Sequence, residues 1–518
     1  MRKLGTIAGL GMVLVGLAHG DVVLSPLFSD HAVLQRDKPL PVWGTAEPGE
    51  KVAVSLGSQK GSGVAGPDGR WMVTLPAQPV SKEPLVLSVS GKNQLTRQDI
   101  LLGDVWLCSG QSNMDWPLGA CDVPQDIASA DNPQIRHFRV GYHFSAVKVS
   151  EVQGTWAVSG PGTAAGFSAV GYYFGRKLQA ETGVPIGLLT SPVGGTNIEL
   201  WISQETLLDT PALEPYAKQM RESLDTYQQQ LRAALPALRE WSEIAAKVPA
   251  AEKLPMPPAW PDFPFSERVN RPRCVTLHNG MIAPLVPFSV RGAIWYQGES
   301  NADDVLYLEK KRAMVEEWRR LFNNPQMPFY FVQLAAWLAP DEVPAGGGWG
   351  MIRDLQRQCL TIPNTGMASA LDLGNAEDIH PKNKADVGER LALWALRNEY
   401  GKKDLTVSGP LFRDLNIDGN RIQLRFDSLG GGLMVGKKDG RHPTVEDSGT
   451  KLKRFAIAGA DQKWVWADAV ISGDTVILSS PEVPTPVAAR YAYSGNPAGA
   501  NLYNKAGLPA SPFRTDKW

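Results

Sequence analysis

The spacing of hydrophobic and polar positions divides the chain into segments. In residues 21–102, short runs such as 51–56 and 71–75 alternate between apolar and polar side chains, and turns rich in Pro and Gly separate them. Alternation with a period of two is typical of strands with one buried face, and Pro and Gly favour the turns between such strands. Residues 21–102 are therefore predicted to form a small antiparallel β-sandwich domain.

From Asp104 onward, short apolar runs alternate with longer amphipathic stretches. This alternation is typical of a parallel sheet whose strands are joined by covering helices. It predicts a doubly wound α/β core in two parts, residues 103–200 and 274–403. The expected strands are 105–108, 135–140, 186–191, 292–296, 329–334 and 366–371, and the expected helices are 169–180, 314–321 and 384–398.

The pattern of the core is interrupted over residues 201–273. Apolar residues there recur at steps of three and four, which marks one face of a helix. They are Tyr216, Met220, Leu224, Tyr227, Leu231 and Leu235. A Pro-rich stretch over 254–265 then leads back to the core, so residues 201–273 are predicted to form a helical and Pro-rich insertion. Short strands and turns return over 404–518 and predict a C-terminal β domain.

The first 20 residues have the pattern of a signal peptide. Arg2 and Lys3 precede an apolar run that ends at Ala18, and small residues precede Asp21. This run is too short to span a bilayer, and no other stretch comes near ~20 uninterrupted apolar residues. The residue directly after the expected cut is Asp21 and not a cysteine, so a lipid anchor has no attachment point there. We expect export to the periplasm or the medium, with no membrane insertion of the mature form.

The composition is that of an ordinary globular protein, with 43% hydrophobic and 20% charged residues. Lys and Arg number 52 and Asp and Glu 53, so the chain has no basic surplus for binding nucleic acid or an anionic membrane. Up to two disulfides could form in an oxidising compartment, and the alternative for Cys108 is a buried free thiol. The four cysteines are Cys108, Cys121, Cys274 and Cys359, and their pairing stays open.

Polar, glycine-containing loops follow several of the expected strands. Residues 109–114 follow the first core strand, residues 193–197 follow strand 186–191, residues 297–301 follow strand 292–296, and residues 374–381 follow strand 366–371. Carboxyl ends of parallel strands meet at one edge of a sheet, where ligands bind. We therefore expect these loops to converge on one site.

The loops contain the groups that serine esterase chemistry requires. A serine hydroxyl is a poor nucleophile until a base within hydrogen-bond reach takes its proton, and the tetrahedral oxygen needs hydrogen-bond donors. Ser112 and His380 are the candidate nucleophile and base. Glycine at 194 and 195 lets backbone N–H groups approach a substrate closely.

These loop sequences resemble the motifs of the sialate O-acetylesterase family of SGNH hydrolases, in the same order. The matching residues are Gly110-Gln111-Ser112-Asn113-Met114, Gly194-Gly195, Trp295-Tyr296-Gln297-Gly298-Glu299-Ser300-Asn301 and Asp378-Ile379-His380-Pro381. The likeness extends to 27–36 and 501–516, and so covers nearly the whole mature chain. It implies a flavodoxin-like three-layer core with flanking β-sandwich domains, and hydrolysis of acetyl esters on sugars through a serine acyl-enzyme without metal or organic cofactor.

The same resemblance implies an oxyanion hole made by the N–H of Ser112, the N–H of Gly194 or Gly195, and the side-chain amide of Gln297. The wider superfamily has Asn at the place of Gln297. The acetylesterase branch is similar to this sequence in carrying Gln there.

The acid that orients His380 has two candidates. The spacing of the wider superfamily points to Glu377, whereas the acetylesterase branch typically has Asp at the place of Asp378. We favour Asp378, because a shorter side chain in a tight turn more readily reaches Nδ1 of His380. A third possibility is that a backbone carbonyl orients the imidazole.

Glu299, Asn301 and Trp201 are candidate substrate-binding residues. Glu299 could bind a sugar hydroxyl or tie its loop to Arg291, and Trp201 could stack on a pyranose face or belong to the core. No metal site is expected, because the remaining histidines show no metal-like spacing. In the expected mature chain they are His31, His137, His143, His278 and His442.

The expected function is that of a carbohydrate O-acetylesterase acting on acetylated sialic acid. An alternative within enzymes is an acetylesterase for plant cell-wall glycans such as xylan or xyloglucan. An alternative of another class is a non-catalytic glycan-binding protein, which would not need Ser112 and His380 together.

Overall fold

A computed structural model describes residues 21–250, 252–262, 274–344 and 346–518. The predicted signal peptide lies outside the described residues, as does the end of the predicted insertion. No helix in the described ranges is long and apolar enough to cross a membrane.

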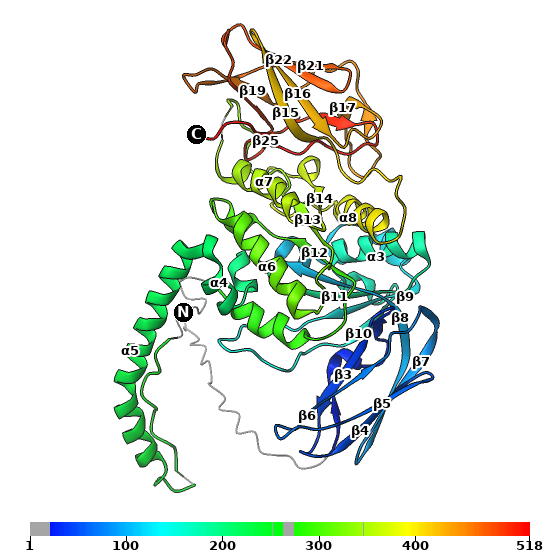
Figure 1. Ribbon diagram of the computed structural model, residues 1–518, viewed down its shortest axis with the longest axis vertical. Helices are drawn as coiled ribbons and strands as arrows, with labels where there is room; N and C mark the ends of the chain where they lie inside the picture. The colour runs from blue at the N-terminus through cyan, green and yellow to red at the C-terminus, as the bar shows by residue number, and fades with distance from the viewer. Residues whose placement is uncertain (1–20, 251, 263–273, 345) are drawn as a thin grey trace, which may run out of the picture.

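A mostly parallel sheet forms the centre of the molecule (Figure 1). Its strands are β8 (Gln94–Gly110), β9 (Asn132–Arg139), β10 (Trp156–Ser159), β11 (Ile186–Pro192), β12 (Gly292–Tyr296), β13 (Phe329–Gln333) and β14 (Thr365–Ser369). They lie in the order β10-β9-β11-β8-β12-β13-β14, with only β10 antiparallel to its neighbour. Each expected core strand is present, and β10 is an additional edge strand.

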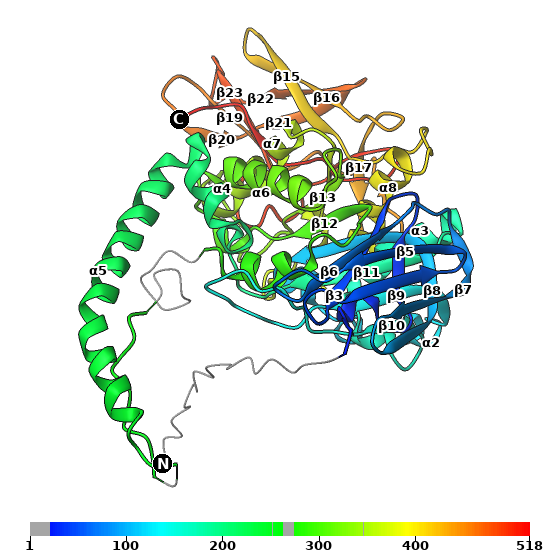
Figure 2. The ribbon, with the colours of Figure 1, turned by 60° about the horizontal axis from the view of Figure 1, so that its bottom comes forward.

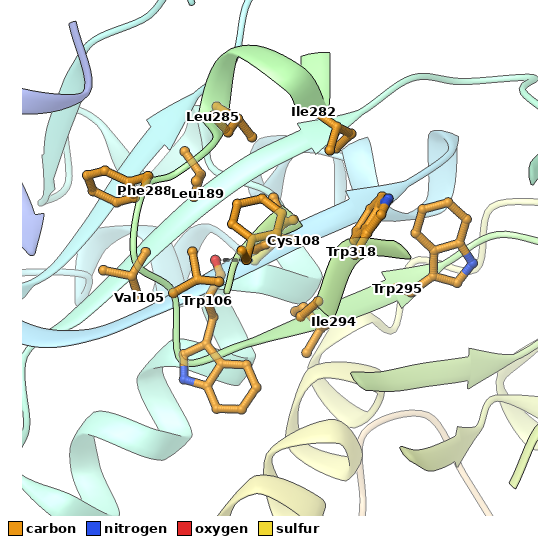
Figure 3. Packing of buried hydrophobic residues seen from close by; sticks show 14 of the residues in the cluster. Val105, Trp106, Cys108, Leu189, Ile282, Leu285, Phe288, Ile294, Trp295 and Trp318 are labelled. Carbon is orange, nitrogen blue, oxygen red and sulfur yellow. Dashed lines mark hydrogen bonds between the residues drawn. The ribbon is translucent and has the colours of Figure 1, made fainter. Parts of the chain in front are cut away.

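Helices cover both faces of this sheet. They are α3 (Ala169–Thr182), α6 (Tyr307–Leu321), α7 (Gly348–Gln358) and α8 (Lys384–Asn398). Trp106 of β8 packs against Phe174 of α3 with ring centroids 5.0 Å apart, and Trp295 of β12 packs against Trp318 of α6 at 5.8 Å. Figure 3 shows Trp106 and Leu285 on opposite sides of the strands. This mixed α/β architecture agrees with the prediction from the sequence.

Strand β8 is much longer than predicted and belongs to two parts of the molecule. Its first half pairs with β7 (Ser81–Ser90), and its second half pairs with β11 and β12. The burial pattern changes at Ile100 from alternating to continuous, because the second half is covered on both faces. The predicted boundary between residues 102 and 103 therefore falls inside a strand and not in a linker.

The N-terminal residues form further short strands beside β8 (Figure 2). They are β1 (Val23–Leu24), β2 (Val33–Gln35), β3 (Leu40–Thr45), β4 (Lys51–Leu56), β5 (Gln59–Val64) and β6 (Arg70–Leu75). All pairings in this part are antiparallel except that of β2 with β8.

The C-terminal residues form small antiparallel sheets around a hydrophobic cluster of their own. Their strands are β15 (Leu411–Asp418), β16 (Arg421–Asp427), β17 (Leu433–Lys437), β18 (Val445–Glu446), β19 (Phe455–Ala458), β20 (Trp464–Trp466), β21 (Asp468–Ser472), β22 (Thr475–Ser479), β23 (Ala488–Tyr491), β24 (Leu502–Asn504) and β25 (Phe513–Arg514). Arg353 of α7 joins this part to the core, because its guanidinium donates to the carbonyl of Leu334 at 2.8 Å and to that of Ser494 at 2.7 Å.

The insertion contains the expected helix, α5 (Glu214–Ala245), which extends away from the body of the molecule (Figure 1). Only its beginning is anchored in the core, through Ala217 and Met220. All four cysteines are buried free thiols, and Cys108 lies within β8.

Candidate active site

The turn from β8 into a short helix places Ser112 at the carboxyl edge of the sheet. Gly110 ends β8 with a φ of 135°, and a Cβ atom there would lie 2.2 Å from the carbonyl oxygen of Tyr296. Only glycine tolerates both this backbone conformation and this approach of the neighbouring strand. The chain then enters α1 (Ser112–Asp115), with Ser112 as its first residue.

Ser112 and His380 are in hydrogen-bond contact, although 268 positions separate them in sequence. The distance from Ser112 Oγ to His380 Nε2 is 2.8 Å. On the other side of the ring, His380 Nδ1 lies 3.2 Å from Asp378 Oδ1. The ring of Trp116 stacks on the imidazole with centroids 4.5 Å apart and an angle of 16° between the planes. A proton on Nδ1 therefore leaves Nε2 to accept the hydroxyl hydrogen of Ser112.

The two candidate acids are placed differently. Asp378 accepts the backbone N–H of His380 at 2.8 Å as well as facing its ring, and these bonds hold the pKa of Asp378 below its ordinary value. Glu377 is exposed, and its backbone N–H donates to Asn375 Oδ1 at 2.9 Å. The geometry therefore places Asp378, and not Glu377, beside the imidazole.

Burial and the nearby ammonium of Lys384 lower the pKa of His380, while Asp378 opposes this shift. The lowered pKa favours a neutral imidazole, which is the form that can accept a proton. The electrostatics of the site therefore favour the protonation state in which His380 can act as a base.

Backbone N–H groups of two loops lie beside Ser112. A Cβ atom on Gly194 would lie 3.3 Å from the Cβ of Ser112, so the two backbones are close together. Within the part of the chain that the structure describes, the N–H groups of Ser112, Gly194 and Gly195 have no acceptor. Gly195 has a φ of 70° and open space around it. The arrangement can donate hydrogen bonds to an oxyanion on Ser112.

The side-chain amide of Gln297, which was expected to be the third donor of the oxyanion hole, is hydrogen-bonded within the protein. Its side-chain nitrogen donates to the carbonyl of Thr196 at 3.1 Å and to Asn301 Oδ1 at 2.7 Å, and its oxygen accepts from the Tyr307 hydroxyl at 3.2 Å. An amide has two N–H donors, so none is left for a substrate oxygen. In this geometry Gln297 holds two loops together.

The side chains of Asn301 and Trp201, two of the expected substrate-binding residues, lie in the protein interior. Asn301 is 5% exposed, accepts the N–H of Ile198 at 2.9 Å and donates to Glu199 at 3.1 Å. Trp201 is fully buried and packs edge-on against Trp295 with centroids 5.9 Å apart. Both side chains therefore contact other groups of the protein.

Glu299 is hydrogen-bonded to the loop that carries Ser112 and not to Arg291. Its Oε1 accepts from the side-chain amide of Asn113 at 2.7 Å, and its Oε2 is buried with no hydrogen-bond partner among the described residues. Arg291 instead pairs with Glu399 at 3.3 Å. Burial raises the pKa of Glu299.

Two residues of this region, Asn113 and Lys384, were missed as site residues. Lys384 is fully buried at the start of α8, and its ammonium donates to Asn113 Oδ1. A lysine in the first turn of a helix opposes the helix dipole, which favours acidic residues there. This unfavourable choice of residue was the signal in the sequence for Lys384, and the signal for Asn113 was its place in the motif 110–114.

No group of three or more His, Cys, Asp or Glu side chains is arranged to hold a metal ion within the described ranges.

Comparisons with known proteins agree on one family of carbohydrate esterases. A family model described as "Carbohydrate esterase, sialic acid-specific acetylesterase" matches residues 102–237 and 264–397. Sialate O-acetylesterase of Mus musculus is 30% identical over 93% of this chain and 92% of its own, and that of Homo sapiens is 28% identical over 98% and 93%. A crystal structure of a carbohydrate acetylesterase from Xanthomonas citri superimposes with a TM-score of 0.78 and 38% identity, over 96% of this chain and 100% of that one.

The matched residues include the Ser112 loop, the Gly194 loop, the 297–301 loop and the His380 loop, which the structure brings to one edge of the sheet. The protein is an esterase, and the chain belongs to the sialic acid-specific acetylesterase family of carbohydrate esterases.

Proposed function

We propose that the protein releases acetate from O-acetylated sugars by serine-dependent acyl transfer on a core of the SGNH-hydrolase type. The observation that carries this proposal is the 2.8 Å contact between Ser112 Oγ and His380 Nε2, with Asp378 behind the imidazole. A glycan-binding protein without catalysis would have no use for this arrangement of nucleophile, base and acid.

In the proposed reaction His380 takes the proton of Ser112 as Oγ attacks the carbonyl carbon of the acetyl ester. The N–H groups of Ser112 and Gly194 stabilise the negative oxygen of the tetrahedral intermediate. The intermediate collapses when His380 gives its proton to the departing sugar hydroxyl, leaving acetyl-Ser112. Water then attacks the acetyl group, His380 takes its proton and returns it to Ser112, and acetate leaves.

We further propose acetylated sialic acid as the substrate. The mouse and human relatives are named sialate O-acetylesterases. A partly exposed cation is also linked to the helix that Ser112 begins. Arg139, at the end of β9, donates to Asp115 Oδ1 at 2.6 Å, and Asp115 lies one helical turn from Ser112. An arginine suits the carboxylate of a sialic acid, whereas a neutral xylose unit does not need one.

The test is acetate release measured side by side from acetylated sialic acid, acetylated xylan and acetylated xyloglucan at equal ester concentration. We expect the highest kcat/KM on acetylated sialic acid. A higher value on xylan or xyloglucan would assign the enzyme to plant cell-wall glycans and leave the serine mechanism standing. Failure to release acetate from all three would contradict the proposed function.

The pH dependence of activity follows from the state of His380. The base must be neutral, so activity is lost as the pH falls through the pKa of His380, which burial and Lys384 lower. We expect the acid limb of kcat/KM to have an apparent pKa below the value of about 6.5 for a free imidazole. An acid limb well above 6.5 would be inconsistent with this assignment of the base.

A further inference from the structure

Asn113 connects the nucleophile loop to the histidine loop by a second hydrogen bond. Its Nδ2 donates to the carbonyl of Ile379 at 3.1 Å. Asn113 follows Ser112 and Ile379 precedes His380, so this bond runs beside the 2.8 Å contact between Ser112 and His380. The relative position of the two loops is therefore fixed twice, once through the reacting side chains and once through this buried amide.

The orientation of the Asn113 amide is set by its two partners, Lys384 and Glu299, on either side. The ammonium of Lys384 can only donate, and it bonds Oδ1. Glu299 Oε1 accepts from Nδ2 at 2.7 Å. A rotated amide would point its NH2 at the ammonium and its oxygen at the carboxylate. Lys384 and Glu299 together select the orientation in which Nδ2 also reaches Ile379.

We propose that Asn113 is a positioning residue of the esterase and that Lys384 and Glu299 lock its amide, so that the His380 loop stays in register with Ser112. Nothing in this role requires contact with substrate. The inference rests on the proposed function, since it assigns the cluster to the same Ser112 and His380 pair.

Lys384 has a second, electrostatic effect on the same histidine. Its ammonium lies 5.9 Å from the ring centroid of Trp116, which stacks on His380, and 5.6 Å from that of Tyr296. Its positive charge disfavours a protonated imidazole. The titratable groups that interact with Lys384 are Cys121, Glu299, Asp378 and His380. Burial lowers the pKa of Lys384 to about 7, so its charge is present over the acidic range in which His380 titrates.

Two substitutions of Lys384 separate its hydrogen bond from its charge. Lys384→Gln keeps an N–H donor for Asn113 Oδ1 but removes the charge. Lys384→Met removes both the donor and the charge and has a side chain of similar length. We expect Lys384→Met to lower kcat roughly ten- to hundredfold, as misplacement of a catalytic group does, with KM nearly unchanged. Lys384→Gln should retain more of kcat. Both should move the acid limb of kcat/KM to higher pH, because the cation no longer opposes protonation of His380.

Lys311→Met is a matched control for the loss of a buried lysine. Lys311 lies on α6, is also fully buried, packs over Phe331 at 3.5 Å, and has no hydrogen-bond partner among the described residues. Its substitution should leave kcat and the acid limb close to those of the unaltered enzyme. Thermal unfolding of each variant shows how much of any loss comes from unfolded protein.

The outcomes separate this inference from the proposed function. Folded Lys384→Met with the kcat and acid limb of the unaltered enzyme would overturn the positioning role, as would equal losses in Lys311→Met. Full activity of Ser112→Ala in the same assay would instead overturn the proposed function itself. A loss of kcat in Lys384→Met that Lys384→Gln partly restores, with both acid limbs displaced upward, supports the inference.

Discussion

Ser112→Ala is expected to abolish acetate release and to leave the fold intact. The substitution removes the nucleophilic oxygen that lies 2.8 Å from His380, and loss of a catalytic serine lowers turnover by roughly 10⁴-fold or more. The side chain is only half-buried and small, so its loss leaves no cavity of consequence. The measurement is acetate release together with circular dichroism and the thermal midpoint of the purified variant.

His380→Ala serves as the companion variant. It should be about as damaging as Ser112→Ala, and the double variant should be little worse than either one, because residues that act as a unit are not additive. A Ser112→Ala protein with turnover near that of the unaltered enzyme would remove Ser112 from the mechanism.

The second large effect is expected for Asp378→Asn. Asp378 lies 3.2 Å from His380 Nδ1, and an amide in its place would keep the shape but favour the wrong tautomer of the imidazole. A serine-protease precedent puts such a loss of kcat at the upper end of ~10²–10⁴-fold. The measurement is kcat on one acetylated sugar for Asp378→Asn and for its neighbour Glu377→Gln.

Glu377→Gln is the matched control, because Glu377 is exposed and carries the same kind of group one residue away. It should be mild. A larger loss in Glu377→Gln than in Asp378→Asn would show that the spacing of the wider superfamily holds and that our assignment of the acid is wrong. If both variants stay within about threefold of the unaltered enzyme, another group orients the imidazole and the site is a Ser–His dyad.

Strongly patterned elements could be predicted from the sequence, and elements that run against local propensity could not. The strand Gly292–Tyr296 and the helix Lys384–Asn398 have the predicted bounds, since a short apolar run and an amphipathic stretch define them. Helix α7 was missed because it begins with glycines at 348 and 350, which lower helix propensity. The length of β8 was missed because its alternating half and its buried half resemble two different strands.

The residues of the candidate site also divide into those that the sequence predicted and those that it did not. The motifs predicted Ser112, His380 and Asp378, which the fold brings together, because the reacting groups have few chemical alternatives. Sequence alone could not distinguish a tryptophan that faces substrate from one that faces the core, and the structure shows Trp201 in the core. Gln297 was expected in the oxyanion hole and Asn301 at the substrate, and the structure shows hydrogen bonds from both amides to groups within the protein.

The identity of the nucleophile can be tested directly by covalent labelling. A fluorophosphonate probe reacts with an activated serine hydroxyl, and digestion followed by mass spectrometry locates the adduct. We expect a single stoichiometric adduct on Ser112, absent from Ser112→Ala and strongly slowed in His380→Ala. Stoichiometric labelling of another residue with loss of esterase activity, while Ser112 stays unmodified, would contradict the proposed mechanism.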